Sequence, residues 1–164
     1  MNLRATVFLQ AEIVLIGIVA LALMIRLPLT EGRAENLDLL NIYLDPFILY
    51  GYAASIAFFV AMLKAFQFLG YVKQNNVFSL NSVKALRSIK KCALVLGILI
   101  VLAGIFIRIF HAKDDDPAGF LALCIASTFV CIVIATASTV VEKILQQGVD
   151  IKTENQQLRE QLKK

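Results

Sequence analysis

The sequence has little charge. Only 17% of its 164 residues are charged, whereas 59% are hydrophobic and the mean hydropathy is +0.77. A soluble domain of this size is about half apolar and about a quarter charged. The apolar surplus falls in four blocks of helical length, which indicates lipid rather than water as the surrounding medium. We therefore expect one compact membrane domain rather than a soluble fold.

The patterns of catalytic and metal-binding proteins are also missing. No nucleophile arrangement, glycine-rich phosphate loop or dinucleotide fingerprint is present, so we expect no enzyme and no bound cofactor. The cysteines Cys92, Cys124 and Cys131 lie inside apolar blocks without metal-ligand spacing. We interpret them as small packing residues rather than as zinc ligands or disulfide partners.

Two polar features near the third and fourth blocks leave alternatives open. The carboxylates Asp114, Asp115 and Asp116 suit a hard cation such as calcium, but three adjacent residues rarely converge on one ion. A helix cap with two solvated charges is the favoured interpretation, and no metal is expected. The single histidine, His111, is interpreted as an interfacial anchor, with a sensor of external pH as the alternative.

The apolar blocks predict an all-α, antiparallel four-helix membrane bundle over residues 1–145, with spans at about 5–27, 46–69, 90–110 and 118–141. The uncharged run 13–25 of the first block covers only about 20 Å, so this helix must include Glu12 to cross a core of about 30 Å. A cleaved signal peptide is the alternative for this block. An uncleaved span is favoured, because the rest of the chain is itself a membrane protein.

Two Asp-Pro pairs predict helix starts. In each pair the aspartate is a strong N-cap, and a proline at the first helical position removes an N–H that has no partner there. Asp45-Pro46 opens the second helix and Asp116-Pro117 the fourth.

Four glycines inside the apolar blocks are interpreted as positions of close helix contact. They are Gly17, Gly51, Gly97 and Gly104.

A polar segment, Lys73–Cys92, separates the second and third spans, and we call it the hinge. It carries five basic residues: Lys73, Lys84, Arg87, Lys90 and Lys91. Basic residues beside a membrane are attracted to anionic lipid headgroups, so this face is expected to contact lipid, and it also suits a protein partner. Nucleic acid is not an expected ligand, because these charges lie against the bilayer.

After the fourth span, residues 146–164 are expected to continue as a helical tail outside the membrane. Its apolar residues recur in a seven-residue pattern, with Asn155 at a position where asparagine sets register in a two-stranded coil. Gly148 interrupts the seam and the pattern covers only about three heptads. An amphipathic or frayed tail is therefore an equal alternative.

The distribution of positive charge predicts orientation. Twelve of the 16 Lys and Arg residues fall on the side of the hinge and both termini, and four fall on the other side. Because cytoplasmic loops are enriched in Lys and Arg, the hinge and both termini are predicted to be cytoplasmic.

Two charged residues are predicted inside the spans at similar depth, Glu12 in the first and Lys64 in the second. Intramembrane charges are costly and usually pair. We predict that Glu12 pairs with Lys64, or that Lys64 extends to the interface while Glu12 meets Arg87 or Lys90. Such a pair fixes helix register; a site coupled to protons or ions is the alternative.

Three stretches resemble a family of small bacterial four-helix membrane proteins that has only a domain-of-unknown-function label. They are NNVFSLNSVKALRSIKKCA, DDDPAG and VVEKILQQGVDIKTEN, and the resemblance covers about Tyr43 to Asn155. It implies a multi-pass protein of the cell inner membrane, often encoded beside a small helix-turn-helix regulator, and it implies no catalytic residues. The family pattern stops soon after Asn155, so the final QQLREQLKK favours an added helical extension.

Two functions are compatible with these features. The first is a non-enzymatic interaction or sensing protein, whose hinge and tail bind a cytoplasmic regulator or a second copy of the chain. The second is a subunit of a small oligomeric transporter or channel, in which Glu12, Lys64 and the hydroxyl groups of the fourth span line a path. Four short spans leave little room for a central site, so this alternative requires an oligomer.

Overall fold

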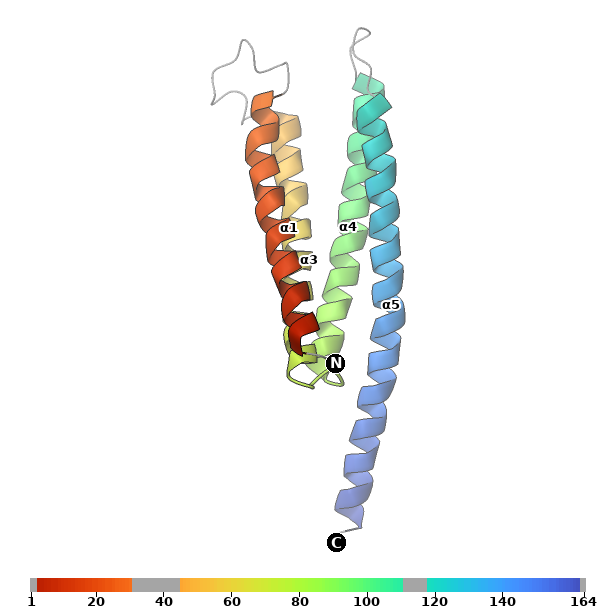
Figure 1. Cartoon of the computed structure of the whole chain (residues 1–164). Helices are drawn as coiled ribbons and strands as arrows, with labels where there is room; N and C mark the ends of the chain where they lie inside the picture. The colour runs from red at the N-terminus through yellow and green to blue at the C-terminus, as the bar shows by residue number, and fades with distance from the viewer. Residues whose placement is uncertain (1–2, 31–44, 111–117, 163–164) are drawn as a thin grey trace.

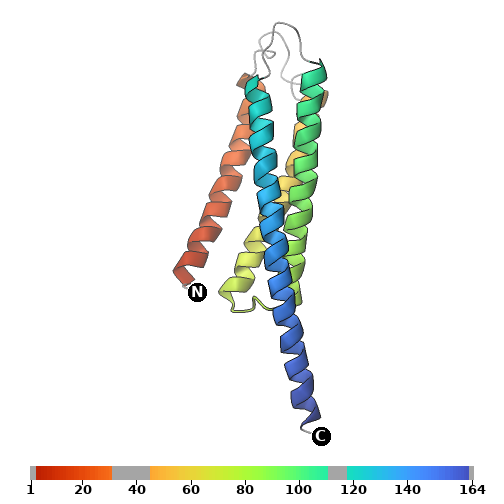
Figure 2. The same cartoon turned by 90° about the vertical axis from the view of Figure 1, so that its right-hand side faces the viewer.

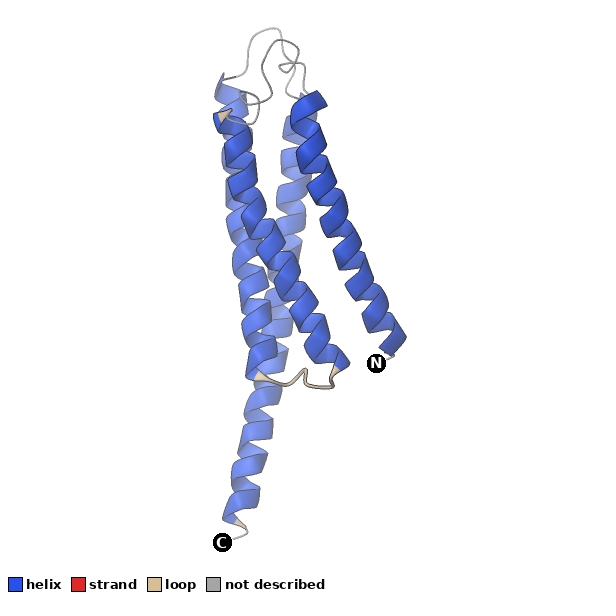
Figure 3. Ribbon diagram, turned by 90° about the vertical axis from the view of Figure 1, so that its left-hand side faces the viewer, coloured by secondary structure: helices blue, strands red, loops and turns tan. Residues whose placement is uncertain are grey.

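The computed structural model of the chain describes residues 3–30, 45–110 and 118–162. The described part consists of four long helices: α1 (Leu3–Thr30), α3 (Pro46–Lys73), α4 (Leu80–Phe110) and α5 (Ala118–Gln161). All four are long and apolar enough to cross a membrane, and no strand occurs within the described ranges (Figures 1 and 3). The predicted all-α membrane bundle is therefore confirmed.

The start of α3 forms as its sequence predicts. Asp45 is the N-cap, and its Oδ1 accepts a hydrogen bond of 2.8 Å from the Phe47 N–H, while Pro46 occupies the first helical position. The second Asp-Pro pair, Asp116-Pro117, lies outside the described residues, as do His111, Asp114 and Asp115. The helix continues to Lys73, four residues beyond the predicted span, and ends before Asn75, which has a positive φ of 54°.

The helices pack in chain order. α5 lies along α4 over the greatest length, α4 lies along α3, and α1 contacts α3, whereas α1 and α5 make no extensive contact among the described residues. α1 and α3 are inclined to the α4–α5 pair, and α5 extends far beyond the other helices (Figures 2 and 3). Both chain ends and the link between α3 and α4 lie at one end of the bundle, which we call the hinge end (Figure 1).

Glycines set the close contact between α4 and α5. A Cβ at Gly97 would lie 3.3 Å from the Cys131 Cβ, and a Cβ at Gly104 would lie 3.5 Å from the Cys124 Cβ. Glycine and cysteine thus meet twice, seven residues apart on each helix, which confirms the packing role predicted for these four residues. Gly51 differs, since open space surrounds its Cβ position and the contact predicted there is not formed.

A hydrogen bond from α3 completes the backbone of α1. Residue 28 is proline and has no N–H, so the Met24 carbonyl lacks its usual helical donor. The Tyr52 hydroxyl donates to this carbonyl over 3.2 Å. The first span was predicted to end at about residue 27, but α1 continues through Pro28 to Thr30.

Candidate functional site

The hinge is a short loop followed by the first turns of α4. Ser79 caps α4: its Oγ accepts from the Ser82 N–H at 3.3 Å. The Ser82 side chain is fully buried, and its hydroxyl donates to the Asn76 carbonyl over 3.1 Å. Because Ser82 bonds the loop to the helix that follows, the hinge has a defined conformation.

A cluster of buried apolar residues lies beside this loop. Val83, Leu86 and Ile89 of α4 pack against Leu145 and Val149 of α5, and all five side chains are buried. Ala65, Phe68 and Val77 lie around its edge. The cluster comes before Cys92 on α4 and after Val141 on α5, so it lies at the ends of the uncharged runs rather than within them.

An ion triad joins α4 to α5 beside this cluster. Glu142 Oε1 accepts from Arg87 Nε and Glu142 Oε2 accepts from Lys90 Nζ, each at 2.8 Å. The Glu142 residue is only 7% exposed. Hydrogen bonds from Lys90 and then from Arg87 hold the pKa of the Glu142 carboxyl below its ordinary value of 4.5, against a smaller opposing effect of burial. The triad therefore remains ionised at neutral pH.

The ion partners differ from those predicted. Arg87 and Lys90 bind Glu142 rather than Glu12, while Lys64 Nζ donates to Gln67 Oε1 on its own helix at 3.1 Å. Within the described part of the chain, Glu12 and Lys64 form no ion pair, and Glu12 is exposed. The Glu12–Lys64 pair is therefore not formed in this structure.

The contacts of Glu142 with Arg87 and Lys90 follow from the antiparallel register of α4 and α5, although they were not predicted from the sequence. Phe110 ends one helix and Ala118 begins the next. Counting back equally from these ends brings residue 142 level with residue 86. Glu142 then falls within a turn of Arg87 and Lys90.

Four basic residues of the hinge are exposed or half-exposed. Lys73, Lys84 and Lys91 are exposed, and the Arg87 side chain is 49% exposed although it pairs with Glu142. Lys84, Arg87 and Lys91 recur at three- and four-residue spacing, so they share one side of α4. We call these four residues the basic face.

A second contact links the hinge to α5. A Cβ added at Gly148 would overlap the Phe78 ring, so the ring lies directly over the glycine backbone. Phe78 nevertheless remains 51% exposed. The sequence treated Gly148 as a break in the tail pattern, but its missing side chain makes room for an aromatic residue from the loop.

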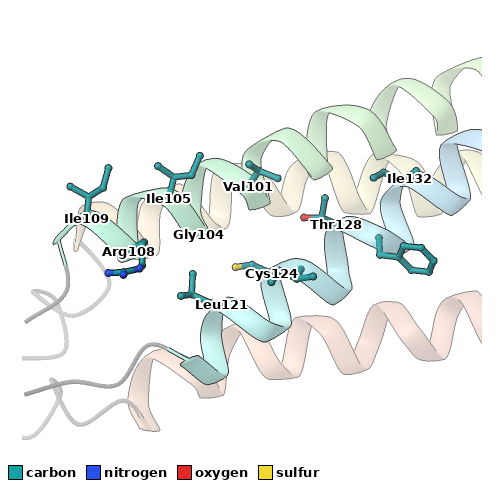
Figure 4. Close-up of a pocket in the computed structure, with 11 residues that line it drawn as sticks. Val101, Gly104, Ile105, Arg108, Ile109, Leu121, Cys124, Thr128 and Ile132 are labelled. Carbon is teal, nitrogen blue, oxygen red and sulfur yellow. The ribbon is translucent and has the colours of Figure 1, made fainter.

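The far half of the α4–α5 pair holds an apolar groove of about 550 Å³. Gly104 and Arg108 of α4 and Cys124 and Thr128 of α5 are among its lining residues (Figure 4). No group of three potential metal-ligating residues occurs in the described ranges. The groove offers shape and apolar surface, but no set of reactive groups.

In the single chain, the hydroxyls of the fourth span have local surroundings that differ from one to the next. Thr136 donates to the Ile132 carbonyl and Thr139 to the Ala135 carbonyl, each at 2.8 Å on the same helix. Thr128 and Ser127 line two different grooves.

Comparison with known proteins gives two consistent results. The chain is 36% identical over 157 residues to a protein of Bacillus subtilis (strain 168) described as "Uncharacterized membrane protein YoaS", and the match covers 94% of this chain and 98% of that protein. No solved structure matches the chain significantly. A family model described as "Protein of unknown function (DUF2975)" matches residues 13–157, which include all three stretches that carried the resemblance. The chain is a membrane protein with four helices of membrane-spanning length among its described residues, and it belongs to the DUF2975 family.

Proposed function

We propose that this membrane protein is a non-enzymatic interaction protein that binds an acidic cytoplasmic protein partner at its hinge end. The observation that carries the proposal is the packing of that end. The apolar cluster and the ion triad hold the first turns of α4 rigidly against α5, and the basic face is displayed on this support. A surface held in one conformation loses little entropy when a partner binds.

Charge supports a partner of acidic character. Glu142 neutralises only part of the hinge charge, because a single carboxylate serves both Arg87 and Lys90. Lys73, Lys84 and Lys91 are exposed. An acidic protein surface is the natural complement, and anionic lipid headgroups compete for the same residues.

Orientation is part of the proposal. The excess of Lys and Arg at the hinge end favours a cytoplasmic position for the hinge and both termini, in the inner membrane of the cell. A partner in this compartment, such as a soluble regulator protein, reaches the basic face directly.

The test compares two variants of the full chain. Lys84→Glu/Lys91→Glu reverses the charge of two exposed residues, and Lys84→Arg/Lys91→Arg preserves it. Each variant is purified from gently solubilised membranes after crosslinking in cells, and the recovered proteins are identified by mass spectrometry. We expect to recover one acidic protein with the wild type and with the arginine variant. The amount recovered with the glutamate variant should be at least about tenfold lower, because each reversed contact costs about 1 kcal/mol.

Recovery of the same proteins with all three chains would contradict this function. A binding assay with vesicles of anionic lipid separates the competing explanation. If charge reversal abolishes only vesicle binding, then lipid alone occupies the basic face and the proposal fails.

A further inference from the structure

Residues 144–162, which we call the α5 extension, carry an apolar seam whose large side chains are exposed in the described chain. Ile144, Ile151, Leu158 and Leu162 are 56%, 59%, 50% and 87% exposed. Ile144, Ile151 and Leu158 are seven residues apart, and Gly148, Asn155 and Leu162 form a second seven-residue series between them. This is the a/d spacing of a coiled coil, in which large apolar side chains pack against a second helix.

The seam is separate from the face that binds α4. Glu142, Leu145 and Val149 face α4 and are buried. At 100° per residue, the centre of the seam lies about 130° around the helix from the centre of the face that binds α4, so a second helix can pack there without displacing α4. Phe78, which lies over Gly148, supplies apolar surface where the seam itself has no side chain.

Charges beside the seam select the orientation of the second helix. Glu154 lies along one edge of the seam, next to Asn155. Lys152 and Arg159 lie along the opposite edge. In a parallel pair, Glu154 of each chain lies beside Arg159 of the other, giving two attractive contacts. In an antiparallel pair, Lys152 and Arg159 face each other and repel.

The membrane supplies the same orientation. Two copies inserted in one bilayer with the same topology extend their α5 helices in the same direction, so only the parallel arrangement is available to them. Asn155 fits this arrangement, since asparagine at such a position favours two strands in fixed register. In the single chain its Nδ2 donates to the Ile151 carbonyl of its own helix over 3.1 Å.

We infer that the α5 extension binds the α5 extension of a second copy as a parallel two-stranded coil through Ile144, Ile151, Asn155, Leu158 and Leu162. Anchoring in one membrane offsets the shortness of the seam, because it concentrates the two tails and fixes their direction. The pairing also brings two basic faces close together, so a partner with twofold symmetry meets two docking surfaces.

Disulfide formation in native membranes tests the pairing. Identical residues at a and d positions face each other only in a parallel coil, so Asn155→Cys and Leu158→Cys are expected to give a dimer of about twice the 18.1 kDa chain mass on mild oxidation. Thr153→Cys and Glu160→Cys lie on the outer side of the coil and are the matched controls. The native cysteines are common to all four variants and to the wild-type control.

The expected dimer yield is at least fivefold higher at the two seam positions than at the two controls. Glu154→Arg should lower the yield at position 158 about fivefold, as expected when two exposed attractive pairs become repulsive, and adding Arg159→Glu should restore it. Equal yields at all four positions, no dimer at any position, or crosslinks only to a different protein would each overturn the inference. Partner recovery at the basic face is measured separately, so failure here does not imply failure of the proposed function.

Discussion

The α4–α5 pair is held together differently at its two ends. At the hinge end, large apolar side chains form a cluster beside an ion triad. Further along, the same helices meet through Gly97 and Cys131 and through Gly104 and Cys124. In water, burial of large apolar groups drives association, whereas in lipid, helices associate through close packing of small residues. We infer from the change in packing that the helices leave the bilayer between these two regions, so the apolar cluster and the ion triad lie at the proposed docking surface.

Leu145→Ala should have the largest effect on stability. Leu145 is 5% exposed in the hinge-end cluster, so its loss leaves a cavity and should cost about 2–4 kcal/mol of unfolding free energy. Leu63→Ala is the control, since Leu63 is 63% exposed, and it should cost less than about 1 kcal/mol. Denaturation of both variants in mild detergent measures the difference. If both variants lose the same unfolding free energy, packing at the hinge end is no more important for stability than an exposed residue of the apolar spans.

Glu142→Gln should rank second. It removes the carboxylate and leaves Arg87 and Lys90 without their shared anion, but both cations keep partial access to water. We therefore expect a loss of about 2 kcal/mol, below the range for a fully buried pair. Gln is close in size, so packing is preserved, and the same unfolding measurement applies. A variant as stable as the wild type would show that the triad contributes nothing to the junction.

The triad also predicts a pH dependence. Because the folded-state pKa of Glu142 lies below its ordinary value of 4.5, its stabilising effect is present above that value and is lost as pH falls through the lowered pKa. The stability difference between wild type and Glu142→Gln should therefore be constant near neutral pH and shrink below about pH 4.5. A difference that stays constant to pH 3, or that shrinks near pH 7, would contradict the assigned ion pairs.

Two glycine substitutions have the smallest expected effects. Gly97→Ala tests the close contact of α4 with α5 away from the hinge end, and Gly51→Ala is its control. In Gly97→Ala the new Cβ meets the Cys131 Cβ at 3.3 Å, and this atom moves only with the backbone of α5, so we expect a loss of about 1 kcal/mol. Gly51→Ala enters open space and should stabilise α3 by up to about 1 kcal/mol through helix propensity. Thermal unfolding of the pair in detergent should shift in opposite directions. Shifts of the same sign would argue against close glycine packing of α4 on α5.

Local patterns predicted the helices well. Hydropathy predicted the four long apolar helices, and Asp45-Pro46 predicted the start of α3. These features depend on residues that are near one another in the chain.

The ion pairs could not be predicted in the same way, because they depend on which helix faces meet. Glu12 and Lys64 were predicted at similar depth but form no pair among the described residues, whereas Glu142, for which no partner was predicted, is buried against α4. The Phe78–Gly148 contact depends on the path of a loop, and a glycine in a heptad pattern does not reveal it.

Membrane orientation tests the central claim most directly, since the proposed docking surface must face the cytoplasm. Lys84 is exposed, so Lys84→Cys places a reactive thiol on the basic face, and the wild-type chain controls for the native cysteines. We predict that a membrane-impermeant maleimide labels this variant only after the membrane is opened. Equal labelling in intact cells would place the basic face outside and contradict the proposed function.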